Sequence, residues 1–133
     1  ATSFVNPKAV PLMADAVAEI MEGRAAYMEV EGKLRTAAKS AKRGKVELDE
    51  AMKAKLLEAQ TKVTAAMQKF TTKRDGMVTV PEITGLQLRT VSELLGVLAS
   101  GKSPKYAKDI DMVHAHLGNA LVYASIWAQK GYQ

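Results

Sequence analysis

The 133-residue chain contains no cysteine, few aromatic residues and no long apolar segment. The absence of cysteine excludes disulfides, thiolate zinc sites and cysteine nucleophiles, and it leaves the redox compartment open. Because no run of about 18 purely apolar residues is present, we expect no membrane span. We expect a soluble protein, with a virion or the cytoplasm favoured over secretion.

Motifs for catalysis and for metal or cofactor binding are also missing. The sequence has no G-x-G-x-x-G, no G-x-x-x-x-G-K-[ST] and no H-E-x-x-H. His114 and His116 are two positions apart and so point to different helix faces, whereas helical ligand pairs lie three or four apart. We therefore predict a protein that is not an enzyme and that carries no metal or cofactor.

Helical periodicity, in contrast, extends through nearly the whole chain. Pro7 and Pro11 disfavour helix before about Val10, and Gly44, Gly76 and Gly101 interrupt the pattern further on. The expected helices span residues 10–41, 47–75, 81–100 and 104–129, and residues 75–82 are expected to be extended, with room for one short strand. The predicted fold is all-α: an up-down bundle of about four helices in a single domain, 11–133, preceded by an extended N-terminal arm, 1–10.

Apolar side chains at three-to-four spacing define the core expected for this bundle. The spacing is most regular in the second and fourth helices. The predicted core residues are Met13, Val17, Ile20, Met21, Tyr27, Met28, Leu34, Met52, Leu56, Ala59, Val63, Ala66, Phe70, Ile83, Leu86, Val91, Leu94, Leu95, Leu98, Tyr106, Ile110, Val113, Leu117, Ala120, Ala124 and Trp127.

Positive charge is concentrated in one part of the chain. The net charge is −3 over residues 1–31, +8 over residues 32–74 and zero over residues 75–133. The stretch LRTAAKSAKRGK, residues 34–45, holds five basic side chains and no acidic one, at the predicted turn between the first two helices. Helix C-termini and solvated turns favour such charges in any protein, and this alternative stays open.

The same stretch is suited to nucleic acid or another polyanion, because clustered lysine and arginine neutralise phosphates. It has no aromatic residue for stacking and no Asn or Gln for base edges, so it would bind backbone without reading sequence. The predicted nucleic-acid-binding residues are Lys33, Arg35, Lys39, Lys42, Arg43 and Lys45.

The fourth predicted helix is unusual in the opposite sense, because residues 112–129 carry no formal charge. A helix that packs by one face normally shows charges on the other, so we expect this helix to be covered on more than one side by other copies of the chain. The alternative is an uncharged solvent face made by its histidine, asparagine, serine and glutamine side chains. The predicted oligomer-interface residues are Phe4, Leu117, Leu121, Tyr123 and Trp127.

An arm, a bundle, a local basic patch and charge-poor helices together resemble, in architecture, the all-helical coat proteins of filamentous viruses. We therefore predict a structural protein that forms a homo-oligomer or filament around a polyanion. One alternative is a monomeric ligand-binding or haem-binding bundle, because the chain is similar to four-helix bundle cytochromes in having Met13 early and His114 in the last helix. Another is a helical docking module for a different protein.

Overall fold

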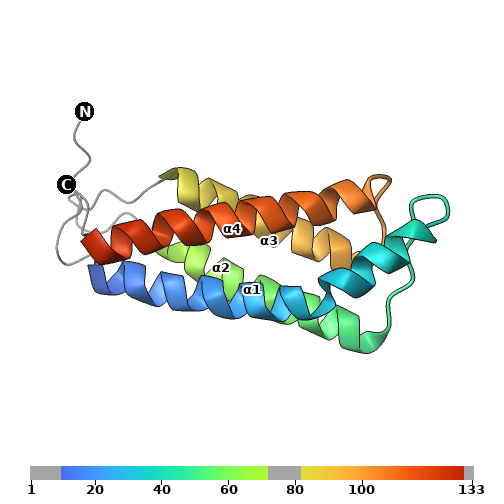
Figure 1. The fold of residues 1–133 in the computed structure, drawn as a ribbon, viewed down its shortest axis with the longest axis horizontal. Coiled ribbons are helices and arrows are strands. Elements are labelled where there is room, and N and C mark those ends of the chain that lie inside the picture. Colours follow the sequence, from blue (N-terminus) through green and yellow to red (C-terminus); the bar gives the residue numbers. More distant parts are fainter. Residues whose placement is uncertain (1–9, 72–81, 131–133) are drawn as a thin grey trace.

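Four helices run alternately up and down the molecule (Figure 1). The computed structural model describes residues 10–71 and 82–130, and it confirms the predicted all-α bundle. The helices are α1 Val10–Lys39, α2 Glu50–Thr71, α3 Glu82–Ser100 and α4 Tyr106–Lys130. The predicted arm, apart from its last residue, and nearly all of the extended segment predicted for 75–82 lie outside the described residues.

The helices pack in a closed ring, in which α1 contacts α2 and α4, and α3 contacts the same two helices. Up-down topology sorts the connections by end. The α1–α2 and α3–α4 connections lie together at the end opposite the start of α1 and the finish of α4 (Figure 1). We call residues 40–49 and 101–105 the loop end of the bundle. Segments about sixty positions apart in the sequence therefore become neighbours.

Two of the predicted core stripes are confirmed throughout their described length. All six predicted residues of α2 are buried, and so are those of α4 from Tyr106 to Ala124, while the Trp127 side chain is not among those described. In α1, Met13, Ile20, Tyr27 and Leu34 are buried, but Met21 and Met28 are 56% and 40% exposed. Each of the two methionines follows a buried residue by one position, which rotates it about 100° out of the core.

The predicted stripe of α3 is wrong at its first turn. Ile83 and Leu86 are 68% and 60% exposed, whereas Thr84, Leu88 and Val91 are buried. The buried face therefore passes through positions 84, 88, 91, 95 and 98, because a face of a helix repeats every three or four residues.

Local capping contacts determine where the helices around the loop end begin. Asp49 Oδ1 accepts a hydrogen bond from the Met52 amide at 2.7 Å, so α2 begins at Glu50, three residues later than predicted. Ser103 Oγ accepts from the Lys105 amide at 3.2 Å and donates to Asp109 Oδ2 at 2.6 Å just before and inside α4. Both connections are thus held in place by side-chain to backbone bonds.

Candidate anion-binding site at the loop end

A tight turn stands at the tip of the α1–α2 connection. The Lys42 amide donates to the Lys45 carbonyl at 3.1 Å, and the Lys45 amide donates back to the Lys42 carbonyl at 3.0 Å. The two residues between them have positive φ, 54° at Arg43 and 72° at Gly44, the combination of a type I′ turn. The sequence KRGK therefore forms a two-residue turn and not a loose loop.

This turn is joined to the α3–α4 connection by backbone hydrogen bonds. The Val46 amide donates to the Gly101 carbonyl at 2.7 Å, and the Ser103 amide donates to the Gly44 carbonyl at 2.8 Å. Gly101 has a φ of 70°, and a Cβ built on it would lie 2.4 Å from the Val46 carbonyl oxygen. Only glycine tolerates both the left-handed conformation and this close approach, so the docking of the two connections depends on it.

Three lysines come together in this arrangement. Antiparallel bridges pair Lys42 with Lys45 and Lys45 with Lys102. Side chains directly opposite one another across an antiparallel pair project from the same face, so the three lysine side chains leave one face of adjacent segments spaced roughly 5 Å apart. We call Lys42, Lys45 and Lys102 the lysine row.

The pairing of Lys45 with Lys102 is electrostatically unfavourable. The hydrogen bonds flank this pair and do not join its two residues, which is the type of antiparallel pair whose side chains are closest. Like charges directly opposite one another destabilise a sheet, and no carboxylate of the described residues forms an ion pair with either lysine. An anion held between the two ammonium groups would remove this repulsion.

Other cations surround the lysine row. Among the residues that the structure describes, no ion pair engages any of the exposed basic side chains at or beside the loop end, although Glu47, Asp49, Asp109 and Asp111 are close by along the chain. These basic residues are Lys39, Lys42, Arg43, Lys45, Lys102, Lys105 and Lys108. The loop end is therefore a region of unbalanced positive charge.

Four of the six predicted nucleic-acid-binding residues, Lys39, Lys42, Arg43 and Lys45, belong to this region. Lys33 is exposed on α1, roughly two turns before the helix ends. Lys102, Lys105 and Lys108 were missed, because their stretch GKSPKYAKD has two acids close by and no net excess comparable to that of residues 34–45. The predicted topology could have indicated these three lysines, because an up-down bundle places its first and third turns at the same end.

Arg35 differs from the other five predicted residues, because its charge is balanced by acidic side chains within the fold. Its guanidinium donates to Glu31 Oε1 at 2.7 Å and to Asp111 Oδ1 at 2.6 Å, linking α1 to α4. Hydrogen bonds to Asp111 and then Glu31 raise the pKa of Arg35 above its usual value. This side chain links α1 to α4 through its ion pairs, and its contact with phosphate stays a prediction.

The same cluster holds His114. Its Nδ1 lies 3.0 Å from Glu31 Oε2, and Glu31 is itself buried. Burial opposes ionisation of Glu31, but the hydrogen bonds from His114 and Arg35 prevail and lower the pKa of the carboxyl. His116 lies on a different face, with its Nδ1 buried and without a hydrogen-bond partner in the described part of the chain.

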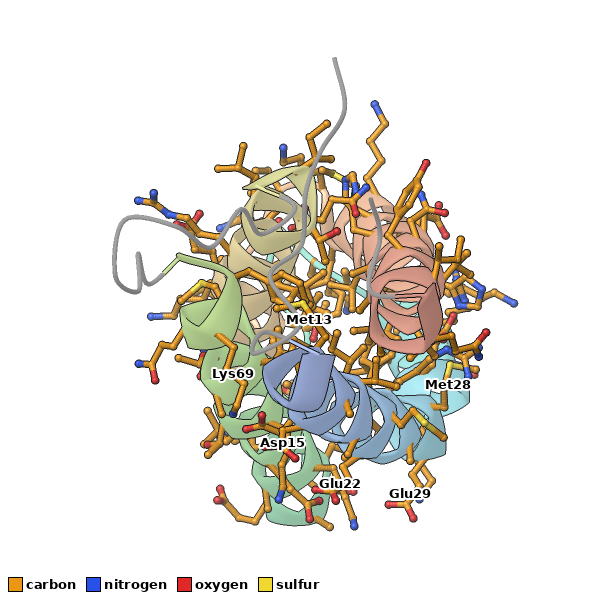
Figure 2. All side chains as sticks on the ribbon, turned by 90° about the vertical axis from the view of Figure 1, so that its left-hand side faces the viewer. Met13, Asp15, Glu22, Met28, Glu29 and Lys69 are labelled. Carbon is orange, nitrogen blue, oxygen red and sulfur yellow. The ribbon has the colours of Figure 1, made fainter. Side chains whose placement is uncertain are left out.

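The haem alternative based on Met13 and His114 does not fit this geometry. His114 contacts Glu31, which follows Met13 by eighteen positions on the same helix, or about 27 Å along its axis. Met13 lies at the opposite end of the bundle, inside the core (Figure 2). The two side chains cannot ligate one iron. No group of three acidic or histidine side chains among the described residues is arranged to hold a metal ion.

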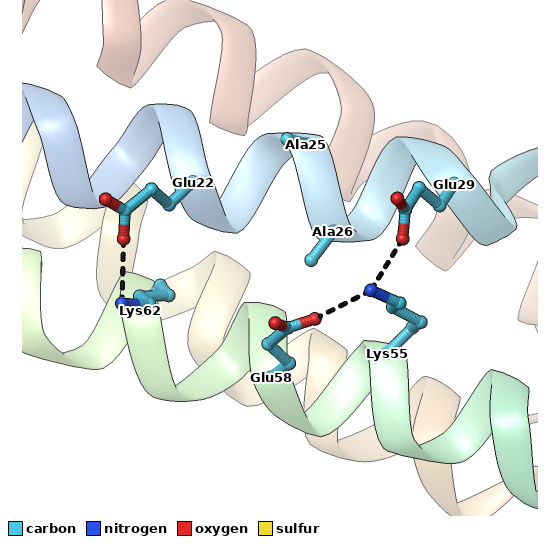
Figure 3. Close-up of a pocket in the computed structure, with 7 residues that line it drawn as sticks. All are labelled: Glu22, Ala25, Ala26, Glu29, Lys55, Glu58 and Lys62. Atoms are coloured by element: carbon cyan, nitrogen blue, oxygen red, sulfur yellow. Dashed lines mark hydrogen bonds and ion pairs between the residues drawn. The ribbon is translucent and has the colours of Figure 1, made fainter.

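The structure also has a shallow groove between α1 and α2 that was not predicted. Charged side chains that pair with one another line it. Lys62 contacts Glu22 at 2.7 Å, while Lys55 contacts Glu29 at 2.8 Å and Glu58 at 3.2 Å across a floor of alanine (Figure 3). Lys69 continues this ladder by pairing with Glu19. Complementary charges at these intervals hold α1 and α2 in one register. The charged lining of the groove is therefore explained by helix packing and needs no ligand.

The predicted oligomer-interface residues have different environments. Leu117 is 1% exposed in the core of its own bundle, so its predicted role at a subunit interface is corrected. Leu121 is partly buried against the core, and Tyr123 is 50% exposed. Phe4 and the side chain of Trp127 lie outside the described residues.

Comparison with protein-family models, curated proteins and solved structures found no match to this chain. Among the described residues, no helix is long and apolar enough to cross a membrane.

Proposed function

We propose that this chain is a non-enzymatic assembly protein that holds a nucleic-acid backbone at its loop end and associates with further copies through α4. The lysine row is the observation that carries this proposal. Backbone bridges within and between two connections place three lysines side by side, and none of them forms an ion pair with a carboxylate of the described residues. A ligand with closely spaced negative charges is the natural complement of such a row.

The charge-poor surface supports the second half of the proposal. Val122 and Tyr123 on α4 are 58% and 50% exposed, within a helix that has no formal charge from residue 112 to residue 129. Met28 adds to this surface from the side of α1 nearest α4 (Figure 2). Exposed apolar side chains without charged neighbours on their own helix are typical of contacts between proteins.

The backbone-binding half is tested by neutralising two members of the row together, Lys45→Gln and Lys102→Gln. Because each lysine would release about one counterion from a phosphate, the logarithm of affinity for a short nucleic acid should fall with the logarithm of salt concentration less steeply, by about two units of slope. Fluorescence anisotropy of a labelled oligonucleotide over a salt series measures both affinity and slope.

The matched control is Arg24→Gln with Arg89→Gln, which removes the same charge from the middle of α1 and from α3, away from the loop end. Equal losses in both double variants would show that only net charge matters and would sink the assignment of the site. Absence of binding by the unmodified protein, together with binding to vesicles of anionic lipid, would move the loop end to a membrane-surface role.

A further inference from the structure

Arg43 occupies a position that its own conformation disfavours. In a two-residue turn with positive φ at both central residues, the first of them is normally asparagine, aspartate or glycine. Arg43 instead holds a φ of 54°, where a β-carbon crowds the backbone. Asparagine or glycine would form the turn with less strain, so the guanidinium itself is the feature that accounts for arginine here.

The surroundings of Arg43 hold the backbone of its turn at a defined place. The turn is closed by the two bonds between Lys42 and Lys45 and anchored by the bond from Ser103 to Gly44. Arg43 is exposed and makes no ion pair with any described residue. It therefore stands at the tip of a hydrogen-bonded turn, between Lys42 and Lys45 of the lysine row.

Three classes of nucleic-acid contact are distinguishable at such a tip. Single strands are held by stacking of bases on aromatic side chains, and residues 39–49 and 100–105 contain none. In the major groove, arginine and lysine read guanine, whereas asparagine and glutamine read adenine. The same segments contain no asparagine or glutamine, so readout in the major groove would favour G·C sequences. A narrow minor groove needs neither aromatic nor amide side chains, because its enhanced negative potential attracts an inserted arginine between two phosphate rows.

We propose, on the basis of the backbone-binding function above, that the ligand of the loop end is double-stranded nucleic acid, with the lysine row on its phosphates and the Arg43 guanidinium in its minor groove. Two paired backbone segments are too broad for a groove about 6 Å wide, so the side chain would enter while the backbone stays outside. Recognition then depends on groove width and not on base identity.

The test compares three labelled DNA probes of equal length, an A-tract duplex, a G·C duplex and an oligo-dT single strand, with the full chain and its Arg43→Gly variant. The unmodified protein should bind the A-tract duplex several-fold more tightly than the other two probes. Arg43→Gly should lose most of this preference and should raise the melting temperature, because glycine relieves the left-handed strain. Arg24→Gln, which removes one charge elsewhere, should keep the preference.

Four results would contradict the inference. Equal affinity of the unmodified protein for both duplexes would reduce Arg43 to a phosphate contact, and tighter binding of oligo-dT would assign the loop end to single strands. Both of these leave the backbone-binding function standing. Failure of every probe to bind would overturn that function and this inference together. A lower melting temperature of Arg43→Gly would show that the arginine serves the fold.

Discussion

At the scale of single residues, a few positions at and near the loop end need the particular residue that they carry. Gly101 permits the close approach of two connections, and Arg43 carries a charge at a position where glycine would be more stable. Glu31 is a buried carboxylate that is ionised because His114 and Arg35 hydrogen-bond to it. Gly101 affects backbone packing, Arg43 affects the proposed binding and Glu31 affects a pH-dependent ion pair. Their substitutions can therefore be told apart by measurement.

Gly101→Ala should destabilise the bundle by about 2 kcal/mol or more, because alanine is strained at a φ of 70° and its Cβ would meet the Val46 carbonyl at 2.4 Å. Urea unfolding followed by circular dichroism measures this loss. Gly32→Ala is the matched control: it lies within α1, and its Cβ would meet no described atom within 4 Å, so it should stabilise by about 0.5 to 1 kcal/mol. Equal effects of the two changes would contradict the structural role of Gly101.

Glu31→Gln should cost about 2 kcal/mol at neutral pH, because the charged hydrogen bonds to Arg35 and His114 are weakened. The pKa of Glu31 is lowered in the folded protein from an ordinary value of 4.5, so its stabilisation is complete above pH 4.5 and is lost as the pH falls through the folded pKa. Unfolding free energies at several pH values should therefore show the variant and the unmodified protein converging in acid. A difference that persists at low pH would contradict this assignment. Asp111→Asn, at the exposed side of the same cluster, should have a smaller effect.

At the scale of elements, the two connections of the loop end act as structural parts and not as linkers. The α1–α2 connection is ordered by its turn, by its bonds to the α3–α4 connection and by the Asp49 cap. The ladder of lysine and glutamate pairs between α1 and α2 holds the register of the helices from which this connection emerges.

Removal of the α2 cap tests whether the order of this helix start affects oligonucleotide binding. Asp49→Ala should destabilise by about 1 kcal/mol, because the Met52 amide loses its acceptor at 2.7 Å. Thermal unfolding gives the change, and Glu50→Ala is the control, since the Glu50 side chain is largely exposed and only pairs with Lys53. If the cap matters only for α2, oligonucleotide affinity should stay within twofold of the unmodified protein; a larger loss would mean that the cap also orders the lysine row.

At the scale of the whole molecule, the bundle separates its two proposed interactions. Unbalanced positive charge gathers at the loop end, while the uncharged part of α4, residues 112–129, offers exposed apolar side chains along the flank. Such a division would let copies associate side by side while each presents its loop end to a shared nucleic acid. Ion pairs on the α1–α2 face make that side a poor candidate for apolar contact (Figure 3).

Tyr123→Glu should lower the mass of the assembly, because a charge would be placed in a surface that is otherwise uncharged over residues 112–129. Light scattering after size-exclusion chromatography measures this mass. Leu57→Glu is matched in exposure, 49% against 50%, but lies on α2 and should leave the mass unchanged. A monomeric unmodified protein would contradict self-association and favour a docking module for a different protein.

The sequence by itself determined the helices and most of the core. Gly44 and Gly101 lie between helices as predicted, and apolar spacing places the stripes of α2 and α4 correctly, because both effects act within a few residues. The same reasoning failed at Met21 and Ile83, which are exposed. Apolar spacing identifies the face of a helix that packs, but it does not show how far the neighbouring helices cover the edges of that face.

Only the tertiary structure decided which charges are free and which are neighbours. Arg35 is neutralised by Asp111, which lies 76 positions away, so no local count of charge reveals it. Lys102 joins Lys42 and Lys45 because backbone bonds connect two turns that lie at one end of the bundle. Backbone groups are the same at every residue, and their pairing therefore leaves no signature in a sequence until the fold brings the segments together.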